Sequence, residues 1–383
     1  MKLLQILPSV DPEMGGTAEG VLQMSMQLET VGNSVDVATV DDPAATFISG
    51  YPLNVVALGP SIANYRYSSR LLPWLRANVD KYDAVIVNGI WQYPSFAAWL
   101  ALRRSQVPYY AFPHGMLDPW FKRHYPLKHA KKWLYWPWAD YRVLRDARAV
   151  LYTSEEERRL ARQSFWLYRA NERIAPLGIA LPPASSNALK DAFLRAHPQL
   201  RGRRVLLFMS RLHEKKGCDL LIQSFSKVGA EQPEIALAIA GPDPSGMLPS
   251  LQSLARRLGL FDRICWPGML QGNMKWGALY SAEAFMLPSH QENFGIAVAE
   301  ALSCALPVLI SDKVNIWREI ATDGAGLVAP DTLEGTAANL RTWLSLDVQQ
   351  RCNMSRQAAI SFQRRFSVGA SATALLRLLQ APV

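Results

Sequence analysis

The sequence has few cysteines, and their spacing suits neither a metal site nor a disulfide framework. Its 383 residues include four cysteines, Cys218, Cys265, Cys304 and Cys352, which lie far apart and form no Cys-x-x-Cys pair. Structural zinc sites and small disulfide-stapled domains both depend on closely spaced cysteines. We therefore expect neither, and this cysteine usage fits a reduced, cytoplasmic setting.

Long apolar runs and a leader segment are also lacking. The longest apolar stretches, such as the one within residues 234–240, have the length of a strand, whereas a transmembrane helix needs about 20 apolar residues. Residues 1–8 have one basic residue and a short apolar core, which predicts a first buried strand rather than a signal peptide. The chain contains no repeat of solenoid period, no low-complexity tract and no Asp-x-Asp motif.

The overall composition is that of a globular protein with an excess of positive charge. Hydrophobic residues make up 49% of the sequence, and the formal net charge is +9. Such a charge predicts an acidic partner: nucleotide phosphates, an anionic membrane surface or nucleic acid. Charge alone does not choose among these partners.

Short aliphatic runs recur along the chain, each followed by a turn residue and then by a helical pattern. Continuous apolar strands that alternate with helices are typical of parallel sheets covered on both faces. The sequence therefore predicts an α/β protein with two Rossmann-like, doubly wound domains in tandem. The expected strands span residues 2–8, 35–40, 54–59, 83–88, 108–113, 149–153, 173–177, 204–210, 234–241, 263–268, 284–289, 307–312 and 326–330.

A stretch rich in proline and small residues at 175–186 marks the domain boundary. We expect an N-terminal domain over residues 1–186 and a C-terminal domain over 187–361. The last helix, at about 362–383, is expected to pack back on the first domain. Because ligands of open α/β sheets bind beyond the carboxyl ends of the strands, the chemistry should lie on the loops that follow them.

Two such loops carry unusual charged residues. In the first, Arg211 follows an expected strand, and Lys216 and Gly217 precede a helix. An arginine fork, a lysine charge and a helix N-terminus together suit a diphosphate; the alternative is an ordinary solvated loop. In the second, Glu292 and Glu300 flank Gly295, and Glu300 is expected on an otherwise apolar helix face. A buried carboxylate there needs a partner such as a ribose diol, whereas the alternative is two ordinary helix glutamates.

These two loops together resemble the retaining GT-B glycosyltransferases of family 4, the group 1 glycosyltransferases. The resemblance rests on Ser210-Arg211 with Lys216-Gly217, and on Pro288-Ser289 with Glu292-x-Phe294-Gly295 and Glu300-Ala301. It implies two Rossmann-like domains that face each other across a cleft. It also implies a nucleotide-diphosphate sugar as donor substrate and a glycan or polyprenyl-diphosphate-linked acceptor.

The family pattern gives roles to individual residues of the C-terminal half. Arg211 and Lys216 would hold the donor diphosphate, Glu300 would bind the ribose hydroxyls, and Glu292 would lie near the hexose. Gly268 falls where the family usually contacts the base. Backbone N–H groups would hold sugar hydroxyls or phosphate around Asn293, Phe294, Gly295 and Ile296.

The N-terminal half has weaker candidates. Gly15, Gly16 and Thr17 follow the first strand, and the family places such a loop opposite the donor phosphates; the alternative is a plain strand–helix turn. His114 lies at a strand end where the family often has a histidine directed at the donor hexose or the acceptor, although a lone histidine is more often structural. Another strand end offers amide and aromatic groups for an acceptor: Asn88, Trp91 and Tyr93.

The segment 120–138 interleaves basic and aromatic residues and contains no acidic residue. Such a segment suits an anionic membrane interface. A helix whose aromatic side chains face the core is favoured over this membrane interpretation, and a nucleic-acid stripe is the least favoured of the three.

The expected reaction is a metal-independent hexosyl transfer that keeps the configuration of the donor. Metal-dependent sugar transferases usually hold the diphosphate through an Asp-x-Asp motif, and here Arg211 and Lys216 would replace the cation, so no cofactor is expected. UDP-glucose is the preferred donor and GDP-mannose the alternative, with a role in exopolysaccharide or O-antigen assembly at the inner membrane face. Two rival functions stay open: a nucleotide-sugar epimerase on the same fold, and a non-enzymatic protein that binds membrane or nucleic acid.

Overall fold

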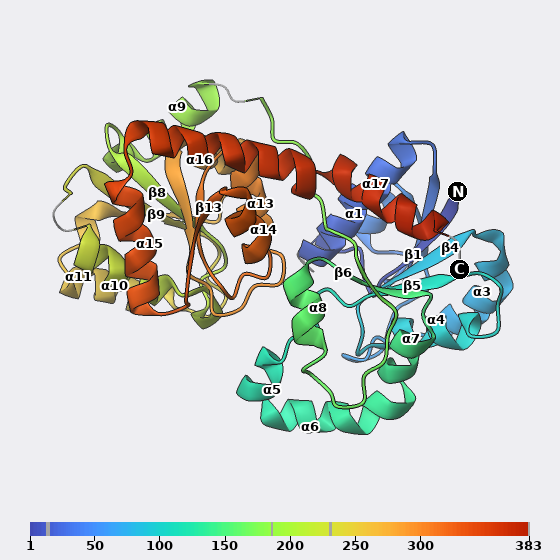
Figure 1. Ribbon diagram of the computed structural model, residues 1–383. Helices are drawn as coiled ribbons and strands as arrows, with labels where there is room; N and C mark the ends of the chain where they lie inside the picture. Colours follow the sequence, from blue (N-terminus) through green and yellow to red (C-terminus); the bar gives the residue numbers. More distant parts are fainter. Residues whose placement is uncertain (13–15, 185–186, 230–231, 382–383) are drawn as a thin grey trace. The chain divides into compact units, whose positions relative to one another are not determined.

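The computed structural model describes residues 1–12, 16–184, 187–229 and 232–381 (Figure 1). The chain forms two compact units. Unit 1 comprises Met1–Ile179 together with Val368–Val383, and unit 2 comprises Ala180–Ser367. The division at Ala180 lies within the proline-rich stretch that the sequence singles out, and the chain returns to unit 1 at Val368.

The described part of unit 1 is built on a seven-stranded parallel sheet in the order β3-β2-β1-β4-β5-β6-β7. Its strands are β1 (Lys2–Ile6), β2 (Ser34–Thr39), β3 (Asn54–Ala57), β4 (Ala84–Asn88), β5 (Tyr109–Phe112), β6 (Ala149–Tyr152) and β7 (Glu172–Ile174). Its helices are α1 (Gly16–Thr30), α2 (Thr46–Ser49), α3 (Leu71–Asn78), η2 (Val79–Lys81), α4 (Tyr93–Leu102), α5 (Trp120–His124), α6 (Pro126–Tyr135), η3 (Trp136–Trp138), α7 (Asp140–Asp146), α8 (Glu155–Ala161) and α17 (Val368–Gln380).

The C-terminal helix α17 belongs to the core of unit 1. Its apolar side chains Ala372, Leu375 and Leu379 pack in one buried cluster with Leu3 of β1 and Leu28 of α1. A second cluster contains side chains of α3, α4 and the 136–165 region. The sheet is therefore covered by helices on both faces, as near-continuous apolar strands require.

Unit 2 holds, in its described residues, a six-stranded parallel sheet in the order β10-β9-β8-β11-β12-β13. Its strands are β8 (Arg204–Met209), β9 (Ile235–Ala240), β10 (Ile264–Gly268), β11 (Ala282–Leu287), β12 (Val308–Ser311) and β13 (Gly326–Ala329). Its helices are α9 (Asn187–Ala196), η4 (Pro198–Leu200), η5 (Glu214–Lys216), α10 (Cys218–Val228), α11 (Leu248–Arg257), η6 (Phe261–Arg263), α12 (Gly272–Ser281), α13 (Ile296–Ser303), α14 (Trp317–Asp323), α15 (Leu333–Ser345), α16 (Val348–Ser361) and the π-helix η7 (Phe362–Phe366).

Every strand overlaps one of the aliphatic runs, so the predicted α/β class with two doubly wound parallel sheets is confirmed.

Among the described residues, none of the helices combines the length and the apolar character that crossing a lipid bilayer requires.

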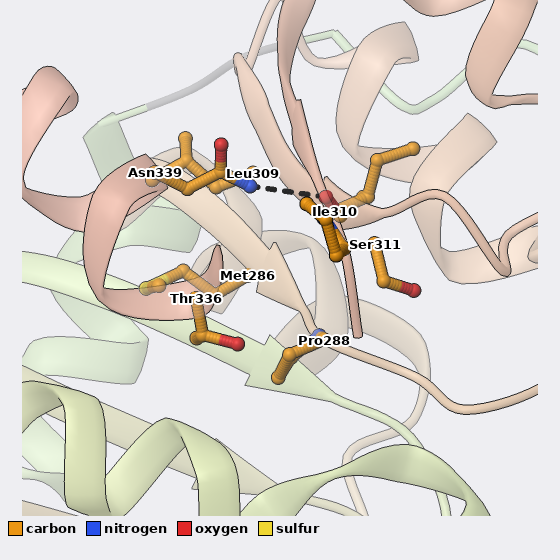
Figure 2. Close-up of a pocket in the computed structure, with 8 residues that line it drawn as sticks. Met286, Pro288, Leu309, Ile310, Ser311, Thr336 and Asn339 are labelled. Carbon is orange, nitrogen blue, oxygen red and sulfur yellow. Dashed lines mark hydrogen bonds between the residues drawn. The ribbon is translucent and has the colours of Figure 1, made fainter. Parts of the chain in front are cut away.

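Helix α15 packs against one face of the unit 2 sheet at β12. Figure 2 shows the Asn339 side chain directed at this strand, and its amide donates a hydrogen bond to the Ile310 carbonyl at 3.0 Å. The space beside Asn339 is bordered by Met286, Pro288 and Leu309 and is too small for a water molecule. Packing this tight fixes the carboxyl ends of β11 and β12, from which the candidate site is built.

The strand order places one switch point in each sheet. In unit 2 the order reverses between β8 and β11, which pair directly through Leu207 and Phe285. In unit 1 it reverses between β1 and β4. The usual ligand position in doubly wound sheets is at such a switch point, beyond the carboxyl ends of the two strands.

Candidate functional site

The first of the two loops at the unit 2 switch point follows β8. Arg211 is exposed and has no hydrogen bond or ion pair with any of the described residues. The loop then forms the short helix η5, and α10 begins after Gly217. The backbone N–H of Leu212 donates to the Pro242 carbonyl at 2.9 Å and anchors the start of the loop. The backbone anchor places Arg211 at the carboxyl end of β8, and its guanidinium donors are open to a ligand.

The second cation of this loop points into the protein. The Lys216 side chain is buried and forms an ion pair with Glu292, which lies on the loop after β11. This pair joins the two loops on either side of the switch point. The sequence identified both residues but did not predict that they contact each other.

Gly217 allows the two loops to approach closely. Its φ is +66°, and a Cβ atom there would lie 2.2 Å from the Pro288 carbonyl oxygen. Two hydrogen bonds reinforce this approach, because the Lys215 carbonyl accepts from the Ser289 hydroxyl at 2.8 Å and from the His290 N–H at 2.7 Å. Only glycine combines this backbone angle with this contact.

Replacing Gly217 with Ala is therefore expected to destabilise the protein more than the same replacement at a site where alanine has an equally positive φ but no clash. Gly246 is a matched control, since its φ is also +66° and a Cβ atom there would meet nothing within 4 Å. Both variants should lose about 1–2 kcal/mol from the backbone angle, and Gly217→Ala a further ~1–3 kcal/mol from the clash. Urea unfolding of both variants measures the difference, and equal losses would contradict the close approach.

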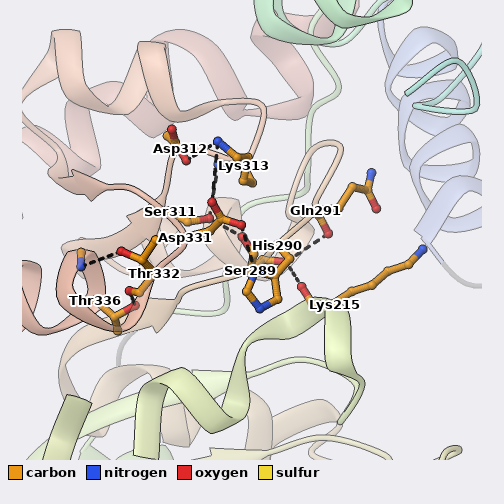
Figure 3. Close-up of polar contacts among 11 residues, drawn as sticks. Lys215, Ser289, His290, Gln291, Ser311, Asp312, Lys313, Asp331, Thr332 and Thr336 are labelled. Atoms are coloured by element: carbon orange, nitrogen blue, oxygen red, sulfur yellow. Dashed lines mark hydrogen bonds and ion pairs between the residues drawn. The ribbon is translucent and has the colours of Figure 1, made fainter. Parts of the chain in front are cut away.

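The loop after β11 is also held from the β12 and β13 side. The Ser311 hydroxyl donates to the Ser289 carbonyl, and His290 Nδ1 lies 2.9 Å from Asp331 Oδ2 (Figure 3). Lys313 lies 3.7 Å from the other oxygen of Asp331. Contacts on both flanks make this loop a preorganised part of the site rather than a free connection.

The N-terminus of α13 supplies backbone donors. Gly295 precedes the helix with φ +77°, and its carbonyl accepts from the N–H groups of Val298 and Ala299. The Phe294 ring is buried and contacts Phe366, so its side chain belongs to the core. Within the described part of the chain, no hydrogen bond uses the N–H groups of Asn293, Phe294, Gly295 and Ile296. Such a row of free donors at a helix start suits an anion or sugar oxygens.

Glu300 differs from its expected environment. It lies on the half-exposed side of α13, and its carboxylate is 2.6 Å from the Lys275 ammonium group of α12. The prediction of an otherwise apolar helix face was wrong, because Val298 and Leu302 point to the core while Glu300 and Ile296 do not. Lys275 was missed because no motif marks it, and only the fold of unit 2 brings this α12 side chain to the carboxylate.

Gly268 ends β10 and lies at the same edge of the sheet. Its carbonyl accepts a hydrogen bond from the Gly241 N–H at 2.8 Å, and the space where a side chain would point is open. Because β9 lies between β10 and β8, Gly268 is two strands away from the loop that holds Arg211 and Lys216. A group bound at Gly268 would therefore lie to one side of a group bound by these two cations.

In unit 1, His114 follows β5 and is fixed by a chain of buried amides. Its Nε2 lies 2.9 Å from Asn88 Oδ1, and the Asn88 amide group donates to Gln5 Oε1 at 2.8 Å. Because the Asn88 nitrogen is used by Gln5, its oxygen accepts from His114 Nε2–H, which leaves Nδ1 as an acceptor. Burial lowers the pKa of His114 to about 4, so the ring is neutral at pH 7.

The His114 backbone is held in an uncommon conformation. Its φ is +50°, and the next residue, Gly115, donates its N–H to the Glu157 carboxylate at 2.5 Å. The same carboxylate accepts from the Thr153 N–H and hydroxyl. Non-glycine residues at positive φ persist where the surroundings over-determine them, often at functional sites. The role of Glu157 was not predicted, although Ser154, which caps α8, shares a readable Ser-x-x-Glu spacing with it.

The three acceptor candidates are used differently by the fold. Asn88 is buried and holds His114, and Tyr93 is buried between Tyr65 and Tyr67. These contacts argue against direct acceptor binding by Asn88 and Tyr93. Trp91 stays half-exposed with φ +73°, and the Lys132 ammonium group lies 4.2 Å from its ring centre.

A buried carboxylate lies beneath Trp91. Asp140 accepts the Trp91 backbone N–H at 3.2 Å, and burial raises the pKa of Asp140 to about 7. Burial also lowers the pKa of Lys132 to about 8. Neither residue was predicted from the sequence to have this environment.

The glycine loop after β1 is described only in part. Gly15 lies outside the described residues, while Gly16 and Thr17 form the first turn of α1. Gly16 is exposed and Thr17 half-buried, so both are accessible at the β1 side of the unit 1 switch point.

Two family patterns match the chain. Residues 190–361 match the family described as glycosyl transferases group 1, and residues 15–178 match the glycosyl transferase 4-like domain. The two matches fall on unit 2 and unit 1 respectively.

Curated relatives are similar at modest identity. The D-inositol 3-phosphate glycosyltransferase of Kineococcus radiotolerans is 29% identical over 64% of this chain and 59% of its own length. The enzyme of the same name from Stackebrandtia nassauensis is 24% identical over 95% of this chain and 86% of its own length. For the first five curated relatives, the match spans between 38% and 60% of the relative's length.

Solved structures share the fold over nearly the whole chain. HepE from Anabaena in complex with UDP superposes with a TM-score of 0.78 at 17% identity and covers 99% of both chains. The same protein with UDP-glucose superposes with a TM-score of 0.74. At this identity the likeness shows the fold alone.

Proposed function

The chain belongs to the group 1 glycosyltransferases of family 4, which have the GT-B fold, and from this premise we propose that it transfers a hexose from a nucleotide-diphosphate sugar. The donor is bound by unit 2. The reaction keeps the anomeric configuration and uses no metal ion or other cofactor.

One observation carries the proposal: two cationic side chains, one exposed and one held by an ion pair, lie at the switch point of unit 2 near free backbone donors. Arg211 is open to a ligand, and Lys216 is held in place by Glu292. The free N–H groups at the start of α13 lie on the same loop as Glu292. A diphosphate that leaves a sugar develops negative charge, and such preorganised donors stabilise it.

The proposed step breaks the bond between the anomeric carbon and the diphosphate oxygen. Arg211 and Lys216 stabilise the departing nucleoside diphosphate, whose phosphate oxygen takes the proton of the acceptor hydroxyl on the same face. The acceptor oxygen then bonds to the anomeric carbon through an oxocarbenium-like state. Glu292 keeps Lys216 in position and lies near the hexose. Because the acceptor oxygen attacks the anomeric carbon directly, the proposed step uses no protein carboxylate as a nucleophile.

The remaining contacts follow the family pattern. Glu300 accepts hydrogen bonds from the ribose hydroxyls, and these bonds replace part of its interaction with Lys275. Gly268 lies by the base, and Gly16 and Thr17 take part in phosphate binding. Neutral His114 hydrogen-bonds the hexose or the acceptor through Nδ1, with Asn88 as its positioning residue.

UDP-glucose is the donor we propose first, and GDP-mannose is the alternative. The UDP-glucose complex of HepE supports a nucleotide-sugar donor for a chain of this fold. The acceptor we propose is a lipid-linked glycan of exopolysaccharide or O-antigen type, which the enzyme would meet at the cytoplasmic face of a membrane.

A donor screen tests this function. Thermal unfolding is recorded with UDP, GDP and ADP sugars in the presence of a chelator. The true donor should stabilise the protein by about 2.7 kcal/mol at a hundred times its dissociation constant. A response to no sugar nucleotide, or one that requires an added divalent cation, would contradict the proposal.

A further inference from the structure

Helix α6 has two opposite faces, and only one of them is covered by the protein. His129 and Trp136 are buried beneath it, and Trp136 stacks on Phe165. The other face presents Leu127, Lys131 and Leu134, which are spaced as neighbours along one side of a helix. The segment 120–138 thus packs partly in the core and leaves an uncovered stripe.

This stripe exposes large apolar side chains. Leu127 is 82% exposed and Leu134 is 78% exposed. Trp138 continues the stripe at 50% exposure, and Trp166 is 80% exposed and stacks on Trp133 of α6. Isolated exposed apolar residues are ordinary, but four large ones on and beside one helix indicate an interaction surface. We call these four side chains and the cations around them the α6 surface.

The charged side chains within residues 120–138 all have one sign. Lys122, Arg123, Lys128 and Lys131 are exposed on α5 and α6, and residues 120–138 contain no aspartate or glutamate. Lys132 does not belong to the surface, because it turns inward over Trp91. Figure 1 shows α5 and α6 at the periphery of unit 1, away from its central strands β1 and β4.

We propose that the α6 surface docks on an anionic lipid bilayer. Leu127 and Leu134 would insert at the headgroup–acyl boundary, Trp138 and Trp166 would lie at headgroup level, and the four cations would contact anionic headgroups. Nucleic acid fits less well, since exposed leucines have no use at phosphates or at stacked bases. The inference goes beyond the transfer reaction and does not depend on it.

Vesicle co-sedimentation tests the docking. The full chain is mixed with phosphatidylcholine vesicles, with and without roughly one third phosphatidylglycerol. We expect binding to the anionic vesicles, and at least about tenfold weaker binding for Leu127→Ser/Leu134→Ser. Val348→Ser/Ile360→Ser is the matched control, because it removes two exposed apolar side chains from α16 of unit 2. This control should bind as the unchanged protein does.

A second variant separates the electrostatic part. Lys128→Glu/Lys131→Glu should weaken binding to anionic vesicles by more than about tenfold and leave the weak binding to neutral vesicles unchanged. Stabilisation by the donor, which is bound by unit 2, should be the same in all variants, so a failure of docking is distinguishable from a failure of the proposed reaction. Unchanged vesicle binding in both α6 variants, self-association through α6, or salt-sensitive binding to DNA or RNA instead of vesicles would overturn the proposal.

Discussion

Replacement of Arg211 by Ala is expected to lower kcat by about 10²–10³-fold while the stability of the fold stays within about 0.5 kcal/mol. The stability is retained because the side chain is exposed and bonds to none of the described residues. The activity is lost because the guanidinium group no longer stabilises the leaving diphosphate. Steady-state turnover and urea unfolding of the same preparation measure the two effects.

Lys216→Ala provides a comparison within the same loop. It should lose as much turnover as Arg211→Ala, and in addition about 1–3 kcal/mol of stability, since Glu292 would be left without its ion-pair partner. Lys227→Ala is the control, because Lys227 of α10 loses the same charge from an exposed ion pair with Glu334 of α15. Near-normal turnover in both site variants would remove the diphosphate assignment.

Replacement of Glu300 by Gln should raise KM for the nucleotide sugar by about 10–100-fold and change kcat only slightly. The carboxylate is proposed to bind the ribose, which takes no part in bond breaking, so its loss weakens ground-state and transition-state binding equally. Initial rates over a range of donor concentrations separate the two constants.

Glu283→Gln is a matched control for Glu300→Gln. Glu283 is also a half-buried carboxylate paired with a cation, Arg204, but it lies near the amino end of β11, at the opposite edge of the sheet. Its loss should leave KM unchanged. A similar KM for the two variants, or a fall in kcat alone for Glu300→Gln, would show that Glu300 does not bind the donor's ribose.

The strands and the position of the site were predictable because both depend on short-range patterns. Aliphatic runs that end in turn residues give strands, and the loops behind them hold Arg211, Lys216 and Glu292 at one edge of one sheet. Gly217 was identified as part of the motif, but its close contact with Pro288 required the packing of two loops far apart in sequence.

Pairings between distant side chains could not be predicted. Lys275 of α12 meets Glu300 of α13 only in the folded unit 2, and Asn88 meets His114 only because β4 and β5 are neighbours. A local pattern does not specify which of several polar groups a buried side chain contacts. The sequence also did not tell the covered face of α6 from the uncovered one, because aromatic residues suit both a core and an interface.

A crystal structure with bound UDP-glucose would test the central claim most directly. We predict phosphate oxygens within hydrogen-bond distance of the Arg211 guanidinium and the Lys216 ammonium groups, the ribose at Glu300, and no metal ion between protein and diphosphate. A diphosphate bound away from both cations, or held through a divalent cation, would contradict this account.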